Sequence, residues 1–210
     1  MKLPTVVMFA ALAMFTLASS ASGEESYSPY TSQTFPDEVY WGDTHLHTNL
    51  SNDAQFHGYR KLGPREAYRF ARGEVVATNN GMKARLKRPL DFLVVADHAI
   101  NMGVMNGLEA KNTELLQSDI GPSWAFKLNE INKNKKADAA KAGKLAWQLH
   151  IDGLMKKTGE VDKFDHSLWR SVAALADEQN NPGKFTAFIG YEWTSSDTHR
   201  VVIFKDNADK

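Results

Sequence analysis

Residues 39–53 read VYWGDTHLHTNLSND, a short apolar run that ends in two histidines one residue apart and is followed by a carboxylate. On a β-strand, residues i and i+2 point to the same face about 6.5 Å apart, so His45 and His47 can converge on one ion while Leu46 faces away. Neutral imidazole is the commonest metal ligand, and Asp53 can add an oxygen from the loop that follows. The stretch therefore predicts a strand that ends in a metal site, with surface or hydrogen-bonded histidines as the alternative.

Two further strand-like runs end in residues of the same chemical kind. Residues 90–96, LDFLVVA, are nearly continuously apolar, which is typical of a parallel strand covered on both faces, and they lead directly into Asp97 and His98. Residues 185–191, FTAFIGY, predict another buried strand, which ends at Glu192. Helical segments separate these runs, so we expect a parallel α/β sheet whose carboxyl edge collects the polar residues.

The predicted edge offers enough nitrogen and oxygen ligands for at least two divalent ions. The candidate ligands are His45, His47, Asp53, His98, Glu192 and His199, the last of which begins a predicted strand over residues 199–204. Cysteine is absent from the chain, which excludes thiolate ligands and disulfides. Glu192 can bridge a pair of ions. Asp43 and Asp97 are expected to orient ligand histidines, as carboxylates near metal-bound histidines usually do.

The remaining segments predict helices and one hairpin around this sheet. A helix is expected over residues 63–72, with Pro64 in its first turn and Gly73 as its stop. Residues 75–86 predict a hairpin, because residues 79–81, NNG, suit a tight turn that requires positive φ. Further helices are expected over residues 123–157 and around residues 168–176.

Length and charge favour one globular domain without affinity for nucleic acid. The chain has 210 residues, with 25 acidic and 25 basic side chains, so no global field attracts it to nucleic acid or to an anionic membrane. The lysines within residues 123–157 are interpreted as a solvated helix face rather than as a nucleic-acid patch.

The first 21 residues have the pattern of a signal peptide. Lys2 provides a positive start, residues 6–17 are apolar, and residues 18–21, ASSA, offer small side chains for cleavage. The apolar run is shorter than the roughly 20 residues that cross a bilayer as a helix. We therefore expect a linker or surface arm over residues 22–38, a globular domain over residues 39–210, and a secreted or periplasmic protein without a stable membrane anchor. An uncleaved anchor is the alternative.

Four motifs, in order along the chain, resemble the N-terminal part of a bacterial family called domain of unknown function 3604. They are residues 40–48, YWGDTHLHT, with Ser51 and Asp53; residues 89–98, PLDFLVVADH; residues 188–193, FIGYEW; and residues 199–204, HRVVIF. That family is similar to the polymerase and histidinol phosphatase (PHP) domains of the metal-dependent phosphoesterases. The resemblance covers the chain from about Val39 to its end.

The resemblance implies a distorted β/α barrel around two or three ions, typically zinc, manganese or iron. It implies that His45 and His47 are the paired ligands of the first strand and that Asp53 is the ligand in the loop after them. His98 would close the second motif, and Glu192 would be the bridging glutamate of a Gly-x-Glu motif. His199 is the remaining ligand candidate.

The chain departs from such relatives at its C-terminal end. Relatives of this kind carry further His-x-His and Asp-x-His ligands on later strands, and this sequence stops at Lys210 before any such motif. A complete β/α barrel takes about 250 residues, so we expect a partial barrel that is truncated at the C-terminus. A fragment is the favoured explanation, and pairing with another polypeptide and a reduced site are the alternatives.

A complete cluster of this kind predicts a metal-dependent hydrolase. Divalent ions lower the pKa of a bridging water towards neutrality and bind substrate oxygens, so the expected reaction is attack of hydroxide on a small-molecule phosphate ester. Glu192, His199 and Arg200 are the candidate catalytic residues, the last two as helpers near the developing oxyanion. A metallohydrolase of sulfate esters or amides and an inactive metal-binding fragment are the alternatives.

Overall fold

In the computed structural model, the described residues are 38–137, 148–149, 161–195 and 198–210. Apart from Glu38 and Val39, they belong to the compact unit Tyr40–Lys210. The predicted signal peptide and residues 22–37 of the predicted arm lie outside them. Within this described part, no helix is long and apolar enough to cross a membrane.

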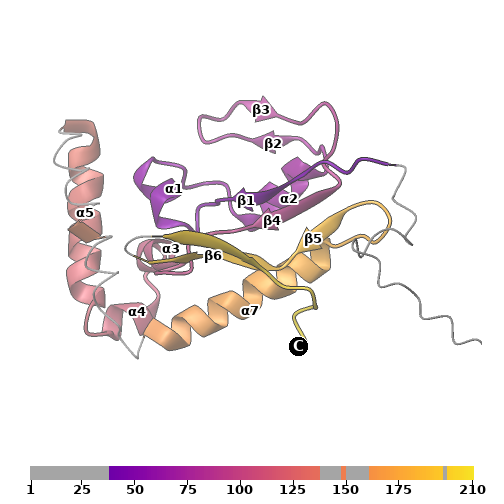
Figure 1. Ribbon diagram of the computed structural model, residues 1–210. Coiled ribbons are helices and arrows are strands. Elements are labelled where there is room, and N and C mark those ends of the chain that lie inside the picture. The colour runs from indigo at the N-terminus through magenta and orange to yellow at the C-terminus, as the bar shows by residue number, and fades with distance from the viewer. Residues whose placement is uncertain (1–37, 138–147, 150–160, 196–197) are drawn as a thin grey trace, which may run out of the picture. The chain divides into compact units, whose positions relative to one another are not determined.

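A parallel sheet of three strands carries the segments singled out above (Figure 1). Its strands, in spatial order, are β1 (Gly42–Leu46), β4 (Phe92–Val95) and β5 (Thr186–Phe188), and both pairings are parallel. Leu93 and Val94 are fully buried in the central strand and Val95 is 2% exposed. The strand predicted within residues 90–96 is therefore confirmed, and so is its burial on both faces.

The described residues also form two antiparallel pairs. β2 (Val76–Ala77) pairs with β3 (Lys83–Ala84), and β6 (Gly190–Thr194) pairs with β7 (His199–Ile203). The hairpin predicted over residues 75–86 is confirmed, with short strands and with Gly81 at φ 88° in its turn. None of these strands tests the expected barrel, which stays a prediction.

The single strand expected over residues 185–191 is instead two strands, so this part of the prediction is wrong. β5 ends at Phe188 in the parallel sheet, whereas β6 begins at Gly190 and pairs with β7. A Cβ at Gly190 would lie 2.5 Å from Val94 Cγ1 and 2.7 Å from the carbonyl oxygen of Val202. The chain can therefore change sheets here because glycine lets the backbone pass close to both neighbours.

Gly190→Ala is expected to lower the free energy of unfolding by about 1–3 kcal/mol, because the added methyl group would push Val94 or β7 aside. Urea unfolding followed by circular dichroism measures the loss. Gly81→Ala is the contrasting variant, since nothing lies within 4 Å of a Cβ there and only its positive φ is unfavourable. An equal or smaller loss for Gly190→Ala would show that close packing at this position does not limit stability.

Helices α2 (Pro64–Ala71) and α7 (Val161–Gln179) pack against one face of the parallel sheet (Figure 1). As predicted, α2 starts at Pro64 and is followed by Gly73 at φ 77°. Its start is further stabilised by Glu66, whose carboxylate accepts a hydrogen bond from the Gly63 N–H at 3.1 Å. The shared core consists of Tyr68, Ala71, Leu93, Val95, Ala173, Ala176, Phe185, Ala187 and Ile189. This packing holds β4 in place, and with it the segment that leads into His98.

A second core lies among α3 (Val104–Glu109), α4 (Thr113–Gln117) and α5 (Gly121–Ala137). The helix expected from residue 123 begins at Gly121, and most of its expected part beyond Ala137 lies outside the described residues. The short helices α3 and α4 were not predicted. The buried members of this core are Val104, Met105, Leu108, Leu115, Ile120, Trp124, Leu128, Ile131, Leu149 and Phe164.

Candidate metal centre

The ends of β1 and β4 converge with β6 at Glu192, whose side chain is buried (2% exposed). The segments are joined through their backbones: the Glu192 N–H donates to the Asp97 carbonyl at 3.0 Å, and the Ala99 N–H donates to the Glu192 carbonyl at 2.9 Å. His98 and Glu192 thereby form an isolated parallel bridge. Glu192 thus reaches the end of β4 from a strand of a different sheet.

Four histidine rings surround the Glu192 carboxylate. Its Oε1 lies 3.1 Å from His45 Nε2 and 3.2 Å from His199 Nδ1. Its Oε2 lies 3.1 Å from His47 Nε2 and 2.8 Å from His98 Nδ1. Neighbouring rings also contact one another, with centroids 4.7 Å apart for His47 and His98. The structure therefore brings together all four histidines that the sequence proposed as ligands.

Asp53 joins this cluster from α1 (Asn52–Phe56), a short helix where a loop was expected. Its Oδ2 lies 3.0 Å from His47 Nδ1 and 3.8 Å from His98 Nε2. Although burial acts in the opposite direction, hydrogen bonds from His47 and Ser51 hold the pKa of Asp53 well below its usual range. Burial lowers the pKa of His47, but the hydrogen bond and charge of Asp53 outweigh it and raise the value overall. Asp53 is therefore an ionised acceptor for the His47 ring.

Three overlapping groups of these side chains have the proximity of metal ligands. Within each group, one nitrogen or oxygen atom per residue lies within 4.8 Å of the others. The groups are His45, His47 and Glu192; His47, Asp53 and His98; and His98, Glu192 and His199. Imidazole nitrogen and carboxylate oxygen are donors that zinc, manganese and iron accept.

Two buried atoms support the fit of a metal ion. Within the described part of the chain, neither His47 Nε2 nor Glu192 Oε2 has a hydrogen-bond partner, although the two atoms approach to 3.1 Å. Buried polar atoms are normally paired, and the contact between these two lacks the geometry of a hydrogen bond. A cation would satisfy both lone pairs at once, so the residues present fit the expected metal.

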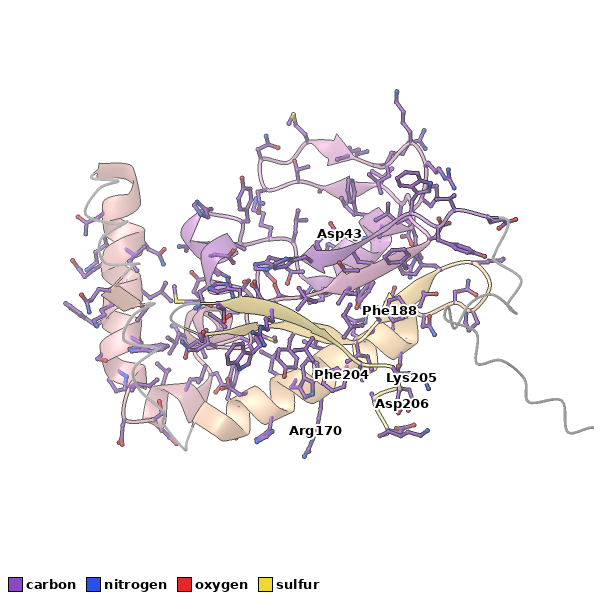
Figure 2. All side chains as sticks on the ribbon, viewed as in Figure 1. Asp43, Arg170, Phe188, Phe204, Lys205 and Asp206 are labelled. Atoms are coloured by element: carbon purple, nitrogen blue, oxygen red, sulfur yellow. The ribbon has the colours of Figure 1, made fainter. Side chains whose placement is uncertain are left out.

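Asp97 and Asp43 hold the backbone of the histidine segment. Asp97 is 1% exposed and accepts hydrogen bonds from the N–H and the hydroxyl of Thr48, at 2.5 and 2.7 Å. Burial raises the pKa of Asp97 to about 6. Asp43 lies on β1 (Figure 2), and its Oδ1 accepts a hydrogen bond from the His45 N–H at 2.8 Å. These carboxylates therefore bind backbone N–H groups and the Thr48 hydroxyl, and their expected role in orienting ligand histidines stays a prediction.

Strand β7 places His199 and Arg200 on opposite faces. His199 pairs with Thr194 and contacts Glu192, whereas Arg200 pairs with Trp193. Because side chains alternate along a strand, Arg200 points away from the Glu192 carboxylate. We therefore leave Arg200 out of the proposed site.

Thr194 and Ser51 contact the cluster, and Thr48 binds Asp97, although no role was predicted for these three hydroxyl residues. Thr194 Oγ1 lies 2.7 Å from His98 Nδ1, and its position two residues after Glu192 on the same strand face could have identified it. Ser51 Oγ lies 3.2 Å from His47 Nδ1. Ser51 and Thr48 follow the end of β1, where no periodicity predicts which way a side chain points.

An apolar cavity of about 220 Å³ adjoins the cluster. It is bordered by His47 and Thr48, by residues of α2 and by residues of the β2–β3 hairpin. An engineered apolar cavity of about 150 Å³ binds benzene, so the cavity beside His47 has room for one aromatic ring.

Comparison with known proteins places the chain in a family. The family model described as "Protein of unknown function (DUF3604)" matches residues 34–210, a range that contains the whole cluster. No curated protein and no solved structure matches the chain. Because the matched range spans more than half of the sequence, the chain belongs to the DUF3604 family, as its motifs predicted.

Proposed function

We propose that this protein is an exported, metal-dependent hydrolase of small-molecule phosphate esters, with a site similar to that of the PHP phosphoesterases. The observation that carries the proposal is the buried Glu192 carboxylate, which has four histidine nitrogens within 3.2 Å. Its two oxygens face different pairs of histidines, so it is suited to bridge two cations. The signal-peptide pattern of the first 21 residues supports export.

The exposure of the cluster indicates the side from which a substrate approaches. The side chains of His45, His199 and Asp53 are 49%, 47% and 45% exposed. Those of Glu192 and His98 are only 3% and 8% exposed. A phosphate group therefore meets His45 and His199 first, while the buried residues hold the centre in place.

Two or three divalent ions held by these residues would supply a water of lowered pKa and positive charge beside the phosphoryl oxygens. In the hydrolysis, the water gives up one proton to solvent and its oxygen forms a bond to phosphorus, the bond from phosphorus to the alcohol oxygen breaks, and the alcohol oxygen takes up a proton. His199 is half-exposed at the mouth of the cluster and is placed to donate that proton. Asp53 holds the His47 ring in a fixed orientation.

Metal content and hydrolysis of a small substrate panel test the proposal. The full chain, purified without a histidine tag, is stripped with a chelator, reloaded with zinc, manganese or iron, and assayed by elemental analysis. 4-Nitrophenyl phosphate, sulfate and acetate then serve as substrates. We expect at least one ion per chain and metal-dependent release of nitrophenol from the phosphate.

His45→Ala and His166→Ala provide the matched comparison. Both histidines are exposed, but only His45 belongs to a ligand group within the described residues. We expect His45→Ala to lose metal and activity and His166→Ala to keep both. Failure of the wild-type chain to take up metal would contradict the proposal as a whole, and metal-dependent hydrolysis of only the sulfate or the acetate would replace the phosphoesterase with another hydrolase.

A further inference from the structure

The hydroxyl of Ser51 has an unusual position for a serine at the start of a helix. Ser51 is the residue before α1, with φ −83° and ψ 135°, and its carbonyl accepts the Gln55 N–H at 3.1 Å. A serine at this position normally uses its side-chain oxygen to accept a hydrogen bond from the first turn. Here the side chain makes no such bond, so the hydroxyl is directed elsewhere.

The Ser51 hydroxyl instead joins two candidate ligands from different strands. Its Oγ lies 3.2 Å from His47 Nδ1, at the end of β1, and accepts a hydrogen bond from the His98 N–H, after β4, at 3.3 Å. Ser51 is fully buried, at 0% exposure. One oxygen therefore holds the ring of one ligand and the backbone of another, shielded from water.

The partners of His47 determine which of its ring nitrogens carries the proton. An ionised carboxylate can only accept, so the contact of 3.0 Å to Asp53 Oδ2 requires the proton on Nδ1. The same N–H then points at Ser51 Oγ. The Nε2 lone pair is left facing Glu192 Oε2, the atom that also has no hydrogen-bond partner among the described residues.

We propose that Ser51 is a positioning residue of the metal centre, which shares the Nδ1–H of His47 with Asp53, fixes the orientation of that ring and ties it to His98 so that both rings are set for a cation before it binds. This inference rests on the metal-binding part of the proposed function and not on the hydrolysis. Outer partners of ligand histidines commonly contribute 10- to 100-fold to metal affinity, and Ser51 has contacts to two ligands.

Ser51→Ala and a matched control, Ser118→Ala, test this role. Ser118 is also buried (2% exposed), and its hydroxyl donates to the Leu115 carbonyl at 2.7 Å and accepts from the Gly121 N–H at 3.1 Å. It lies between α4 and α5 and belongs to none of the ligand groups found among the described residues. Both variants lose one buried hydroxyl with at least two hydrogen-bond partners, so a general loss of packing affects both.

Three measurements are made on the full chain. Calorimetric titration of the metal-free protein with zinc chloride gives the dissociation constant, and thermal unfolding without metal gives the midpoint. Long-range ¹H–¹⁵N spectra, at a pH where the ring is neutral, show which nitrogen of His47 carries the proton. We expect Ser51→Ala to weaken zinc binding about 10- to 100-fold, with a fall in midpoint similar to that of Ser118→Ala. The Nδ1–H tautomer of His47 is expected to persist in Ser51→Ala, because the Asp53 carboxylate still accepts that proton. Ser118→Ala is expected to keep both the wild-type zinc affinity and the Nδ1–H tautomer.

The outcomes separate this inference from the proposed function. Zinc affinity of Ser51→Ala equal to that of the wild type, or an equal loss in Ser118→Ala, would overturn the role of Ser51. If Ser51→Ala does not fold, the wild-type spectrum decides, because a proton on Nε2 of His47 contradicts the inference. Zinc binding that depends on Ser51 in a protein without hydrolytic activity would support the inference and reject the hydrolase. A wild-type chain that binds no zinc rejects the proposed function and, with it, the role of Ser51 in a metal centre.

Discussion

Glu192→Gln is expected to weaken zinc or manganese binding by at least about 100-fold, because loss of an outer partner of a ligand alone commonly costs 10- to 100-fold and Glu192 is the central ligand. The substitution keeps the size of the side chain but removes its negative charge and replaces one acceptor oxygen with a donor NH₂ group. Each carboxylate oxygen faces two histidine nitrogens within 3.2 Å. In either orientation of the amide, an NH₂ group, which cannot bind a cation, therefore replaces the oxygen that faces two of the candidate ligand histidines. Calorimetric titration of the metal-free variant measures the effect.

Glu114→Gln is the control for this substitution. Glu114 is exposed in the first turn of α4 and belongs to none of the ligand groups found among the described residues. It undergoes the same chemical change without a change at the cluster. An unaltered zinc affinity in Glu192→Gln would exclude Glu192 as a ligand and would remove the main support for a bridged centre.

Leu93→Ala is expected to lower the free energy of unfolding of the metal-free protein by about 2–5 kcal/mol. Leu93 is 0% exposed on β4, the strand between β1 and β5, and it packs in the core that α2 and α7 share with the sheet. A small domain is stable by only about 5–15 kcal/mol, so the variant loses a large fraction of its stability. Urea unfolding followed by tryptophan fluorescence measures the change.

Leu86→Ala provides the comparison for the core substitution. Leu86 is only partly buried and lies outside both hydrophobic clusters, so the same truncation leaves a smaller cavity and costs less. Equal losses in the two variants would show that β4 does not have the central place in the core that its burial indicates.

The convergence of the histidines could be predicted because each apolar run ends in polar residues. Continuous hydrophobicity before His98 predicted a buried parallel strand, and the histidines one residue apart predicted one face at the end of β1. Parallel strands bring their carboxyl ends to one edge, so geometry alone placed His45, His47 and His98 together. That expectation depended only on local sequence and a general rule of topology.

The route by which Glu192 reaches this edge could not be predicted in the same way. The run before it is mostly apolar, and a single glycine within it, Gly190, is compatible with a continuous strand as well as with a change of sheet. The change depends on the close approach of Val94 and Val202, which are remote in sequence. The direction of the Ser51 hydroxyl is equally non-local, because its partner His98 follows another strand. Local preference predicts a helix cap for this serine, and a tertiary contact overrides it.

The parallel pairing of β1 with β4, and the bridge from β4 to Glu192, also bear on the order of folding. Segments far apart in the chain must meet before the ligands exist as a set, and closing such long loops is entropically costly. Of the six candidate ligands, only His45, His47 and Asp53 are close to one another in the unfolded chain. A metal ion therefore has little to bind until the sheet has formed, and its binding free energy acts almost entirely on the native state.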